Sequence, residues 1–332
     1  MKKRILVTGG AGFISSNMIR YLLDETDHDV VTMDALTYAG NMANLADVID
    51  NKRLEFIRGD IRNVGEVTRA LEGIDVIVNA AAESHVSKSI EFGGGEFVTT
   101  NVEGTQVLLD AMRDHPNERF ILISSSEVYG TAETEPMDED HPLNPRSPYA
   151  ATKAGGDRLV YSYACTYGMP VAVIRPFNNY GPYQHPEKVI PRFITQALRD
   201  RPLTVHGNGA ASRDWLFVED TSRAIAAALA APIGPLQGEA INVATGVDVP
   251  VLEIAERILD ALGKPRSLIN FVDDRPGQVD RHIGSTDRAA ELISWRAQTS
   301  FADGLERTVA WYRENESWWR GILAREVRAF SS

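Results

Sequence analysis

ILVTGGAGFIS, residues 5–15, is the stretch that decides the fold. Its first four residues predict a strand, and apolar side chains recur at roughly helical spacing between Ile14 and Asp24. The glycines of the intervening turn let the backbone approach a pyrophosphate, and the helix start supplies unpaired N–H groups with a partial positive charge. A glycine pattern alone is a weak signal, but its place at the first strand–helix junction indicates a dinucleotide site. The residues expected to hold the cofactor here are Gly9, Gly12, Phe13 and Ile14.

Short β-rich runs alternate with helical stretches as far as Arg175. This alternation predicts βαβ units, and hence a parallel sheet with helices on both faces. The pattern does not give the order of the strands in the sheet. The expected strands are residues 5–8, 30–34, 54–59, 76–79, 120–124 and 171–175, and the expected helices are residues 14–24, 64–71 and 105–113.

The rhythm loosens in the second half of the chain, where residues 176–209 are rich in Pro, Asn and Gly. We predict a Rossmann-type doubly wound α/β domain over residues 1–176 that also takes in part of 214–245. Residues 177–332 are expected to form mainly a smaller C-terminal substrate-binding lobe. Helices are expected at residues 191–199, 220–231 and 252–262, a strand at 240–243, and the last clear helix at 301–314.

The composition bounds the class of protein. The 332 residues include 43% hydrophobic and 24% charged residues, as in ordinary globular proteins, and the net charge of −12 disfavours nucleic-acid binding. The single cysteine, Cys165, excludes an intrachain disulfide and a thiolate metal site, and no His and carboxylate cluster has metal-ligand spacing. No run approaches the roughly 20 apolar residues that cross a membrane. A cytoplasmic protein with no metal and no membrane partner is therefore expected.

Carboxylates follow the second and third predicted strands. Asp34 lies about 20 residues beyond the glycines, where a carboxylate accepts hydrogen bonds from the adenosine ribose and repels a 2′-phosphate. NAD is therefore favoured over NADP. Asp60, followed by Ile61, either meets the adenine or caps the next helix, and the sequence leaves both interpretations open. Ser15 stands where such turns usually carry a third glycine, so a small packing adjustment is expected.

A second group of residues is typical of proton transfer. Tyr149 and Lys153 are four residues apart, which places them one turn apart on one face of a helix. A neighbouring ammonium and a positively charged nicotinamide ring favour the phenolate of a tyrosine, whose pKa is otherwise about 10. Tyr149 could then take a proton from a substrate hydroxyl while hydride leaves for the cofactor. Ser125, directly after a predicted strand, would hydrogen-bond the same hydroxyl.

These motifs resemble the extended short-chain dehydrogenases/reductases, and more narrowly the nucleotide-sugar 4,6-dehydratases, above all dTDP-glucose 4,6-dehydratase. The resemblance covers nearly the whole chain, and its most specific stretch is NNYGPYQHPEKVIP, residues 178–191. It implies that Ala81 contacts the cofactor and that Asn101 orients the catalytic helix through backbone contacts. The other stretches that carry the resemblance are residues 8–14, 34–45, 81–86, 127–130, 147–153 and 213–220.

The resemblance implies a redox-neutral cycle. NAD+ oxidises C4 of a hexose, water is lost across C5 and C6, and the stored hydride returns to C6. Tyr149 is implied as the base for the first step, with Lys153 and Ser125 in support, and Glu127 as the base at C5, which a 4-epimerase does not need. Ser126 departs from the pattern, because the dTDP-glucose enzymes carry Asp there as an acid. The Ser-Glu pair resembles GDP-mannose 4,6-dehydratases and UDP-glucuronate decarboxylases instead.

Three functions follow from these residues. They are a nucleotide-sugar 4,6-dehydratase, a UDP-glucuronate decarboxylase or 4-epimerase with the same C4 oxidation, and a non-catalytic dinucleotide sensor. Ser87 and Gln278 also depart from the dTDP-glucose enzymes, which usually carry Asp and His there, so the nucleotide base and the sugar are not assigned. A homodimer is expected by analogy. The residues expected to contact the nucleotide diphosphate sugar are His85, Asn178, Asn179, Lys188, Val189, Arg213 and Arg275.

Overall fold

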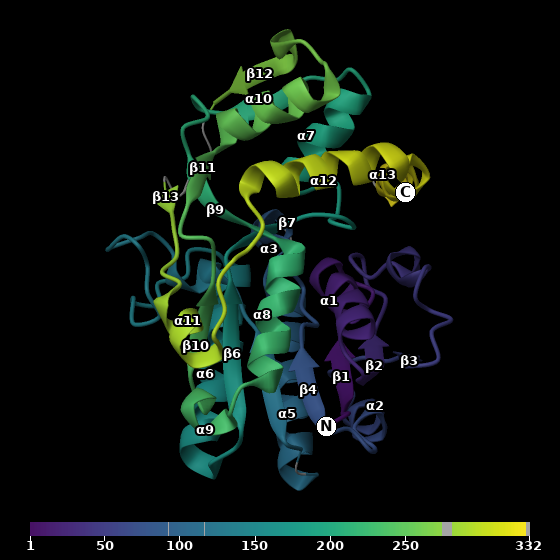
Figure 1. Cartoon of the computed structure of the whole chain (residues 1–332), viewed down its shortest axis with the longest axis vertical. Helices are drawn as coiled ribbons and strands as arrows, with labels where there is room; N and C mark the ends of the chain where they lie inside the picture. The colour runs from purple at the N-terminus through teal and green to yellow at the C-terminus, as the bar shows by residue number, and fades with distance from the viewer. Residues whose placement is uncertain (92, 116, 274–280, 330–332) are drawn as a thin grey trace.

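The centre of the molecule is a sheet of seven parallel strands (Figure 1). The structure is a computed structural model that describes residues 1–91, 93–115, 117–273 and 281–329. The strand order is β10-β6-β5-β4-β1-β2-β3, so the chain winds outward from β1 in one direction and from β4 in the other. Ligands bind at such a switch point, beyond the carboxyl ends of the strands. The strands are β1 Arg4–Thr8, β2 Asp29–Asp34, β3 Leu54–Arg58, β4 Val76–Asn79, β5 Arg119–Ile123, β6 Val171–Pro176 and β10 Ala240–Val243.

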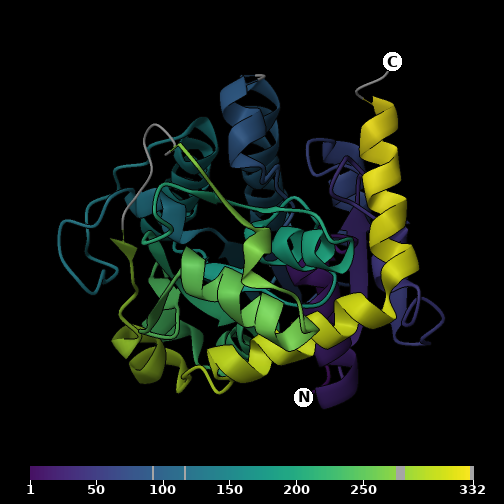
Figure 2. The same cartoon turned by 90° about the horizontal axis from the view of Figure 1, so that it is seen from above.

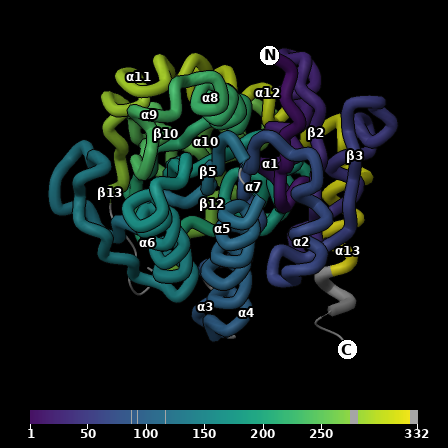
Figure 3. The backbone as a smooth tube through the Cα atoms, turned by 90° about the horizontal axis from the view of Figure 1, so that it is seen from below, coloured from purple at the N-terminus to yellow at the C-terminus, as the bar shows by residue number. Residues whose placement is uncertain are grey.

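Helices cover both faces of this sheet (Figure 3). Because successive side chains of a strand point to opposite faces, Ile5 and Val7 of β1 pack in one core and Leu6 packs in the other. The result is the doubly wound α/β fold that the sequence predicts. The first layer contains α1 Phe13–Glu25, α8 Val218–Ala230 and α11 Asp287–Ile293, and the second contains α2 Val64–Ala70, α5 Gly104–Asp114 and α6 Pro148–Tyr167.

A smaller lobe lies over the carboxyl ends of the sheet strands (Figure 1). It has its own core, in which Phe193, Trp215, Tyr312 and Trp319 are buried together. Its strands are β7 Asn178–Tyr180, β8 Leu203–His206, β9 Ser212–Phe217, β11 Asp248–Pro250, β12 Ile269–Val272 and β13 Arg281–His282. Its helices are α7 Val189–Leu198, α10 Val251–Leu262, α12 Phe301–Glu314 and α13 Glu316–Ala329.

The remaining elements of the described residues are short. They are the helices α3 Val86–Glu91, α4 Gly95–Val98 and α9 Ile233–Leu236, the π-helical turn η2 Thr99–Glu103, and the 3-10 helices η1 Met42–Leu45, η3 Ser126–Tyr129 and η4 Arg266–Leu268. None of the described helices is long and apolar enough to cross a membrane.

The strands and helices expected from the sequence are present within a few residues, with one error at the carboxyl end. The prediction that the helix at 301–314 is the last one is wrong, because α13 follows it. The spacing of apolar residues along the sequence does not predict this helix. Its tertiary contacts hold it: Trp319 is completely buried in the core of the lobe, and Trp318 Nε1 donates to Asn44 Oδ1 at 2.9 Å. Figure 2 shows α13 running beside the N-terminal part of the chain.

Candidate active site

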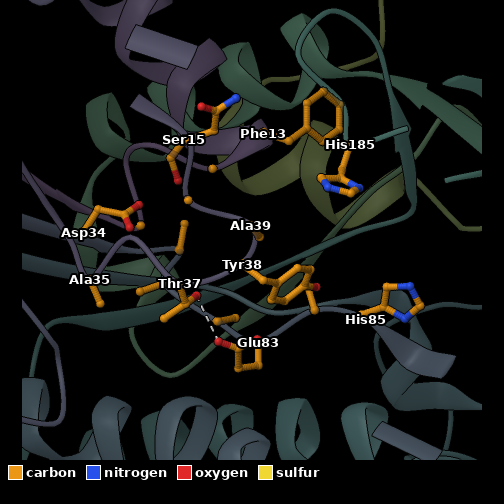
Figure 4. Close-up of a pocket in the computed structure, with 18 of the residues that line it drawn as sticks. Phe13, Ser15, Asp34, Ala35, Thr37, Tyr38, Ala39, Glu83, His85 and His185 are labelled. Atoms are coloured by element: carbon orange, nitrogen blue, oxygen red, sulfur yellow. Dashed lines mark hydrogen bonds between the residues drawn. The ribbon is translucent and has the colours of Figure 1, made fainter. Parts of the chain in front are cut away.

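A cavity of about 740 Å³ opens at the carboxyl ends of the sheet strands. It extends from the glycine-rich turn after β1 to α6, and the loops after β2 and β4 form much of its wall (Figure 4). Most of the residues predicted to bind the cofactor line this one cavity, and Asn101 does not. Those that line it are Gly9, Gly12, Phe13, Ile14, Asp34, Asp60, Ile61, Ala81, Tyr149 and Lys153.

The turn after β1 has no room for side chains at its glycines. Gly9 has a φ of +70°, and a Cβ there would lie 2.8 Å from the Cα of Ala81. A Cβ on Gly10 would lie 1.6 Å from the hydroxyl oxygen of Thr32. Ser15 fits at the place of the third glycine, because its side chain is buried and its hydroxyl donates to the carbonyl of Thr8 at 3.4 Å. The bare backbone of the turn thus faces the cavity.

Asp34 ties the second strand to this turn. One carboxylate oxygen accepts the N–H of Ala11 at 2.9 Å, and the other accepts the N–H of Leu36 at 2.7 Å. Burial raises the pKa of Asp34, and these two hydrogen bonds oppose the rise. Each carboxylate oxygen has a second acceptor position, so the group can also accept ribose hydroxyls.

Asp60 lies on the cavity wall and does not cap the following helix. The cap of α2 is Asn63, whose side-chain oxygen accepts the N–H of Glu66 at 3.2 Å. Asp60 instead holds Arg62 with two hydrogen bonds to Nε at 3.0 Å and one to Nη2 at 2.6 Å. Of the two interpretations that the sequence left open, the helix-cap one is therefore wrong.

Asn101 connects the loop after β4 to α6. Its amide nitrogen donates to the carbonyl of Glu83 at 3.1 Å and to the hydroxyl of Thr152 at 2.9 Å, and its oxygen accepts the N–H of Glu83 at 3.0 Å. It lies in the π-helical turn that leads into α5. Asn101 therefore contacts the helix that carries Tyr149 through the side chain of Thr152, and its backbone contacts are with the loop after β4.

The start of α6 places the tyrosine and the lysine. The hydroxyl of Ser147 caps the helix by accepting the N–H of Ala150 at 3.1 Å, and Pro148 occupies the first turn. Tyr149 and Lys153 then follow one turn apart, and both line the cavity. The predicted pair is therefore on one helix face. We call the part of the cavity that Ser124, Tyr149, Lys153 and Lys188 line its catalytic end.

Burial dominates the acid–base properties of this pair in the protein alone. It raises the pKa of Tyr149 to about 12, although a hydrogen bond with Ser125 opposes the rise. It lowers the pKa of Lys153 to about 8, although the charge of Asp157 opposes the fall. The ammonium of Lys153 donates to the carbonyl of Ile123 at 2.6 Å. Lowering the pKa of Tyr149, as the sequence predicts, therefore also requires the positive charge of the cofactor.

Glu127 lies on the 3-10 helix η3, directly after Ser125 and Ser126. Ser125 caps this helix, and its hydroxyl accepts the N–H of Glu127 at 3.2 Å. Burial raises the pKa of Glu127, and the charges of Arg213 and Lys188 oppose the rise. The charge of Glu127 in turn raises the pKa of Tyr149. A desolvated carboxylate, two cations and the tyrosine therefore act on one another at the catalytic end.

The residues predicted for the sugar diphosphate are spread over several elements. Lys188 and His85 line the cavity, and Lys188 Nζ donates to the carbonyl of Ser84 at 3.3 Å. Asn179 is engaged inside the protein, because its amide nitrogen donates to the carbonyl of Phe177 at 3.0 Å and its oxygen accepts the Thr221 hydroxyl at 2.5 Å. Asn178 begins β7, Val189 begins α7, and Arg213 lies in β9. Arg275 lies outside the described residues.

The cavity wall also carries a cluster of which the sequence predicted only His85. Glu187 Oε2 lies 2.9 Å from His85 Nε2 and 3.5 Å from His185 Nδ1. The Lys88 ammonium lies 3.6 Å from the centre of the Tyr38 ring, whose position relative to His85 and His185 appears in Figure 4. These residues come from three loops, so no local spacing links them. Their only signal is that they lie inside or beside the stretches that carry the resemblance.

A family model described as GDP-mannose 4,6 dehydratase matches residues 6–308. The chain belongs to this family. A dTDP-glucose 4,6-dehydratase of an Actinoplanes species is 43% identical over 322 residues, which are 95% of this chain and 99% of the relative. The low-salt glycan biosynthesis protein Agl12 of Haloferax volcanii is 49% identical and covers 93% of this chain and 98% of its own length.

This chain is similar to solved structures of two kinds of enzyme. The Streptomyces venezuelae DesIV dTDP-glucose 4,6-dehydratase, crystallised with NAD and TYD, matches with a TM-score of 0.91 and 45% identity over 96% of this chain and 99% of that one. A UDP-glucuronic acid 4-epimerase of Bacillus cereus, crystallised with UDP-glucuronic acid and NAD, matches with a TM-score of 0.88 and 32% identity over 94% and 99%. The two kinds share the fold, so the site residues must distinguish them.

Proposed function

We propose that this protein is an NAD-dependent nucleotide-sugar 4,6-dehydratase. It oxidises C4 of the sugar, eliminates water across C5 and C6, and returns the hydride to C6 while C5 regains a proton, which balances the proton that was taken from the C4 hydroxyl. One observation carries the proposal: Ser125 joins Glu127 to Tyr149, because its hydroxyl accepts the N–H of Glu127 at 3.2 Å and also hydrogen-bonds the phenol of Tyr149. Elimination needs a base such as Glu127 at C5, whereas a 4-epimerase does not. The higher identity to the dehydratases than to the epimerase supports the same choice.

NAD fits the residues of the cavity. The glycine turn leaves bare backbone for the pyrophosphate, and Asp34 offers acceptors to the ribose. At the catalytic end, the hydroxyl oxygen of Ser124 is buried on the cavity wall without a hydrogen-bond partner among the described residues, so it is available to a ligand. When bound, NAD+ supplies a hydride acceptor and a positive charge near Tyr149. These features support NAD over NADP.

Side chains of the protein transfer the protons at C4 and C5 of the sugar. Tyr149, assisted by Lys153 and Ser125, takes the proton of the C4 hydroxyl. The resulting ketone acidifies the proton at C5, which Glu127 removes. The raised pKa of Glu127 makes it a stronger base and lets it hold that proton for return to the departing C6 oxygen. This route offers the acid that Ser126, a weak proton donor, does not.

We further propose where the substrate binds and how the protein is organised. Lys188 and Arg213 neutralise the diphosphate, and Asn178, Val189 and Arg275 complete the substrate site. Residues 1–176 with part of 214–245 hold the cofactor, and the rest forms mainly the substrate lobe. The protein works in the cytoplasm as a homodimer. Light scattering that gives the mass of one chain would contradict the dimer.

The test is turnover of defined nucleotide sugars by the purified protein. dTDP-glucose comes first because dTDP-glucose 4,6-dehydratases are among the similar relatives, followed by GDP-mannose, UDP-glucose and UDP-N-acetylglucosamine. We expect a product that has lost one water by mass, and stoichiometric NAD released on denaturing the protein. Carbon dioxide release from UDP-glucuronate, or a mass-neutral change in sugar stereochemistry, would contradict the proposal and indicate a decarboxylase or an epimerase.

A further inference from the structure

Arg175 lies in β6, beneath the catalytic end of the cavity, and is 1% exposed. Its Nε and Nη2 donate to the two carboxylate oxygens of Asp157 at 2.8 and 2.9 Å. Its Nη1 donates to the phenol oxygen of Tyr129 at 2.8 Å, and that phenol donates to Asn242 Oδ1 at 2.7 Å. All four side chains are buried, so the guanidinium joins four separate elements away from water.

Two of these elements carry the proposed catalytic groups. Asp157 lies on α6 one turn after Lys153, on the same helix face. Tyr129 is the last residue of η3, the short helix that carries Glu127. Arg175 therefore connects the segment that takes the C4 proton to the segment that takes the C5 proton. No residue of this connection lines the cavity.

Stability gives no reason for this ion pair. Removing two charges from water is costly, and hydrophobic residues of similar volume in their place often leave stability unchanged or raise it. Burial alone would raise the pKa of Asp157, but the hydrogen bonds and charge of Arg175 outweigh it and hold that pKa below its usual value. The pair therefore remains charged, and its fixed bidentate geometry specifies the distance between α6 and β6.

The two catalytic segments depend on Arg175 to different degrees. α6 has other anchors near its catalytic residues, namely Lys153 on the carbonyl of Ile123 and Thr152 on Asn101. The ring of Tyr129 packs in a small core and against His141, and its hydroxyl provides the side-chain hydrogen bonds that fix the end of η3. Loss of this hydroxyl should therefore displace Glu127 more than the residues of α6.

We propose that Arg175 is a positioning residue that sets the register of η3 against α6 through the Tyr129 hydroxyl. This inference rests on the proposed function, because it assigns the network to the proton transfer at C5. Removing the hydroxyl slows the elimination and leaves the C4 oxidation unchanged. A merely structural role would slow both steps alike or neither.

The first test is Tyr129→Phe in the full chain with bound NAD. Tyr163→Phe is the matched control, because Tyr163 lies on α6 and its hydroxyl likewise donates one side-chain hydrogen bond, here to the carboxylate of Asp110 at 2.7 Å. Single-turnover measurements follow reduced-nicotinamide absorbance for the C4 oxidation and loss of water by mass spectrometry for the elimination. We expect Tyr129→Phe to oxidise at the wild-type rate, to eliminate about tenfold or more slowly, and to accumulate reduced nicotinamide. The control should match the wild type in both steps.

The second test replaces the ion pair itself with apolar groups, as Arg175→Met with Asp157→Leu. We expect a thermal unfolding midpoint close to that of the wild type, and elimination slowed at least as much as in Tyr129→Phe. Wild-type elimination in both variants, or equal slowing of both steps in Tyr129→Phe, would overturn the inference. Failure of the wild-type protein to release water from any nucleotide sugar would overturn the proposed function instead, so the two failures are distinguishable.

Discussion

The two ends of the cavity are built from different kinds of structure. At the cofactor end, main-chain groups of the glycine turn and residues at the ends of neighbouring parallel strands form the wall, and each lies in or next to a recognisable sequence motif. At the catalytic end, Tyr149 and Lys188 line the cavity, and Glu127 on η3 and Arg213 on β9 lie outside its lining, so the group draws on both halves of the chain. The cofactor end is thus specified locally, whereas the catalytic end depends on how the two halves pack.

The largest expected effect separates the two ends by function. Tyr149→Phe removes the group that takes the C4 proton, so turnover should fall by about 10²- to 10⁴-fold. The glycine turn and Asp34, which hold the other end of the cofactor, are untouched by this change, so the purified protein should retain most of its NAD. Turnover is measured as water loss by mass, and NAD is measured after denaturation. Unchanged turnover would mean that the assigned chemistry is wrong.

The next effect lies within the catalytic end. Glu127→Gln should reduce elimination by about 10²-fold, because a neutral amide cannot take the C5 proton. Since burial raises the pKa of Glu127, elimination in the wild type should decline as the pH is lowered through a value above 4.5. A single-turnover pH profile checks this decline. An elimination rate that stays constant well below pH 4.5 would show that Glu127 is not the base.

The same contrast explains what the sequence could predict. The strand, glycine turn and helix at residues 4–25 are local, so their elements and their ligand type could be inferred from spacing. The cluster of Tyr38, His85 and Glu187 could not, because its members are brought together by three separate loops. Helix α13 could not either, because buried Trp319 holds it through contacts with distant parts of the lobe.

The catalytic end should also cost stability. Burial lowers the pKa of Lys153 to about 8 in the folded protein, from 10.5 in the unfolded chain. Below pH 8 both states are protonated and the full cost of the buried charge is present; between pH 8 and 10.5 the folded state loses its proton first and the cost declines. Lys153→Met should therefore raise the free energy of unfolding by about 1–3 kcal/mol at pH 7, after allowance for its lost hydrogen bond.

Denaturant unfolding of Lys153→Met and the wild type at several pH values checks this prediction. The gain should be largest below pH 8 and should shrink as the pH approaches 10.5. A gain that grows with pH has the wrong sign and would show that Lys153 is not held with a lowered pKa. At the cofactor end, burial likewise works against the charge of Asp34 by raising its pKa, and two backbone hydrogen bonds oppose that rise.

The smallest effect tests whether the cofactor end is as local as it looks. Trp318, Ile322 and Arg325 of α13 also line the cavity, and Trp318 Nε1 donates to Asn44 Oδ1 at 2.9 Å. Asn44 is buried, and its amide nitrogen donates to the carbonyl of Ala11 in the glycine turn at 2.8 Å. Helix α13 is therefore connected to the glycine turn by two successive hydrogen bonds through Asn44.

Trp318→Phe should weaken NAD binding about fivefold, because about 1 kcal/mol is the usual contribution of one hydrogen bond. Trp295→Phe is the matched control: Trp295 is buried, whereas Trp318 is partly buried, and the Nε1 of Trp295 has no hydrogen-bond partner within the described part of the chain. Titration of cofactor-free protein with NAD, followed by tryptophan fluorescence or calorimetry, gives both dissociation constants. Equal dissociation constants for the two variants would confine the cofactor site to the first half. A selective loss in Trp318→Phe would make α13 part of that site, because the helix would then hold the glycine turn through Asn44.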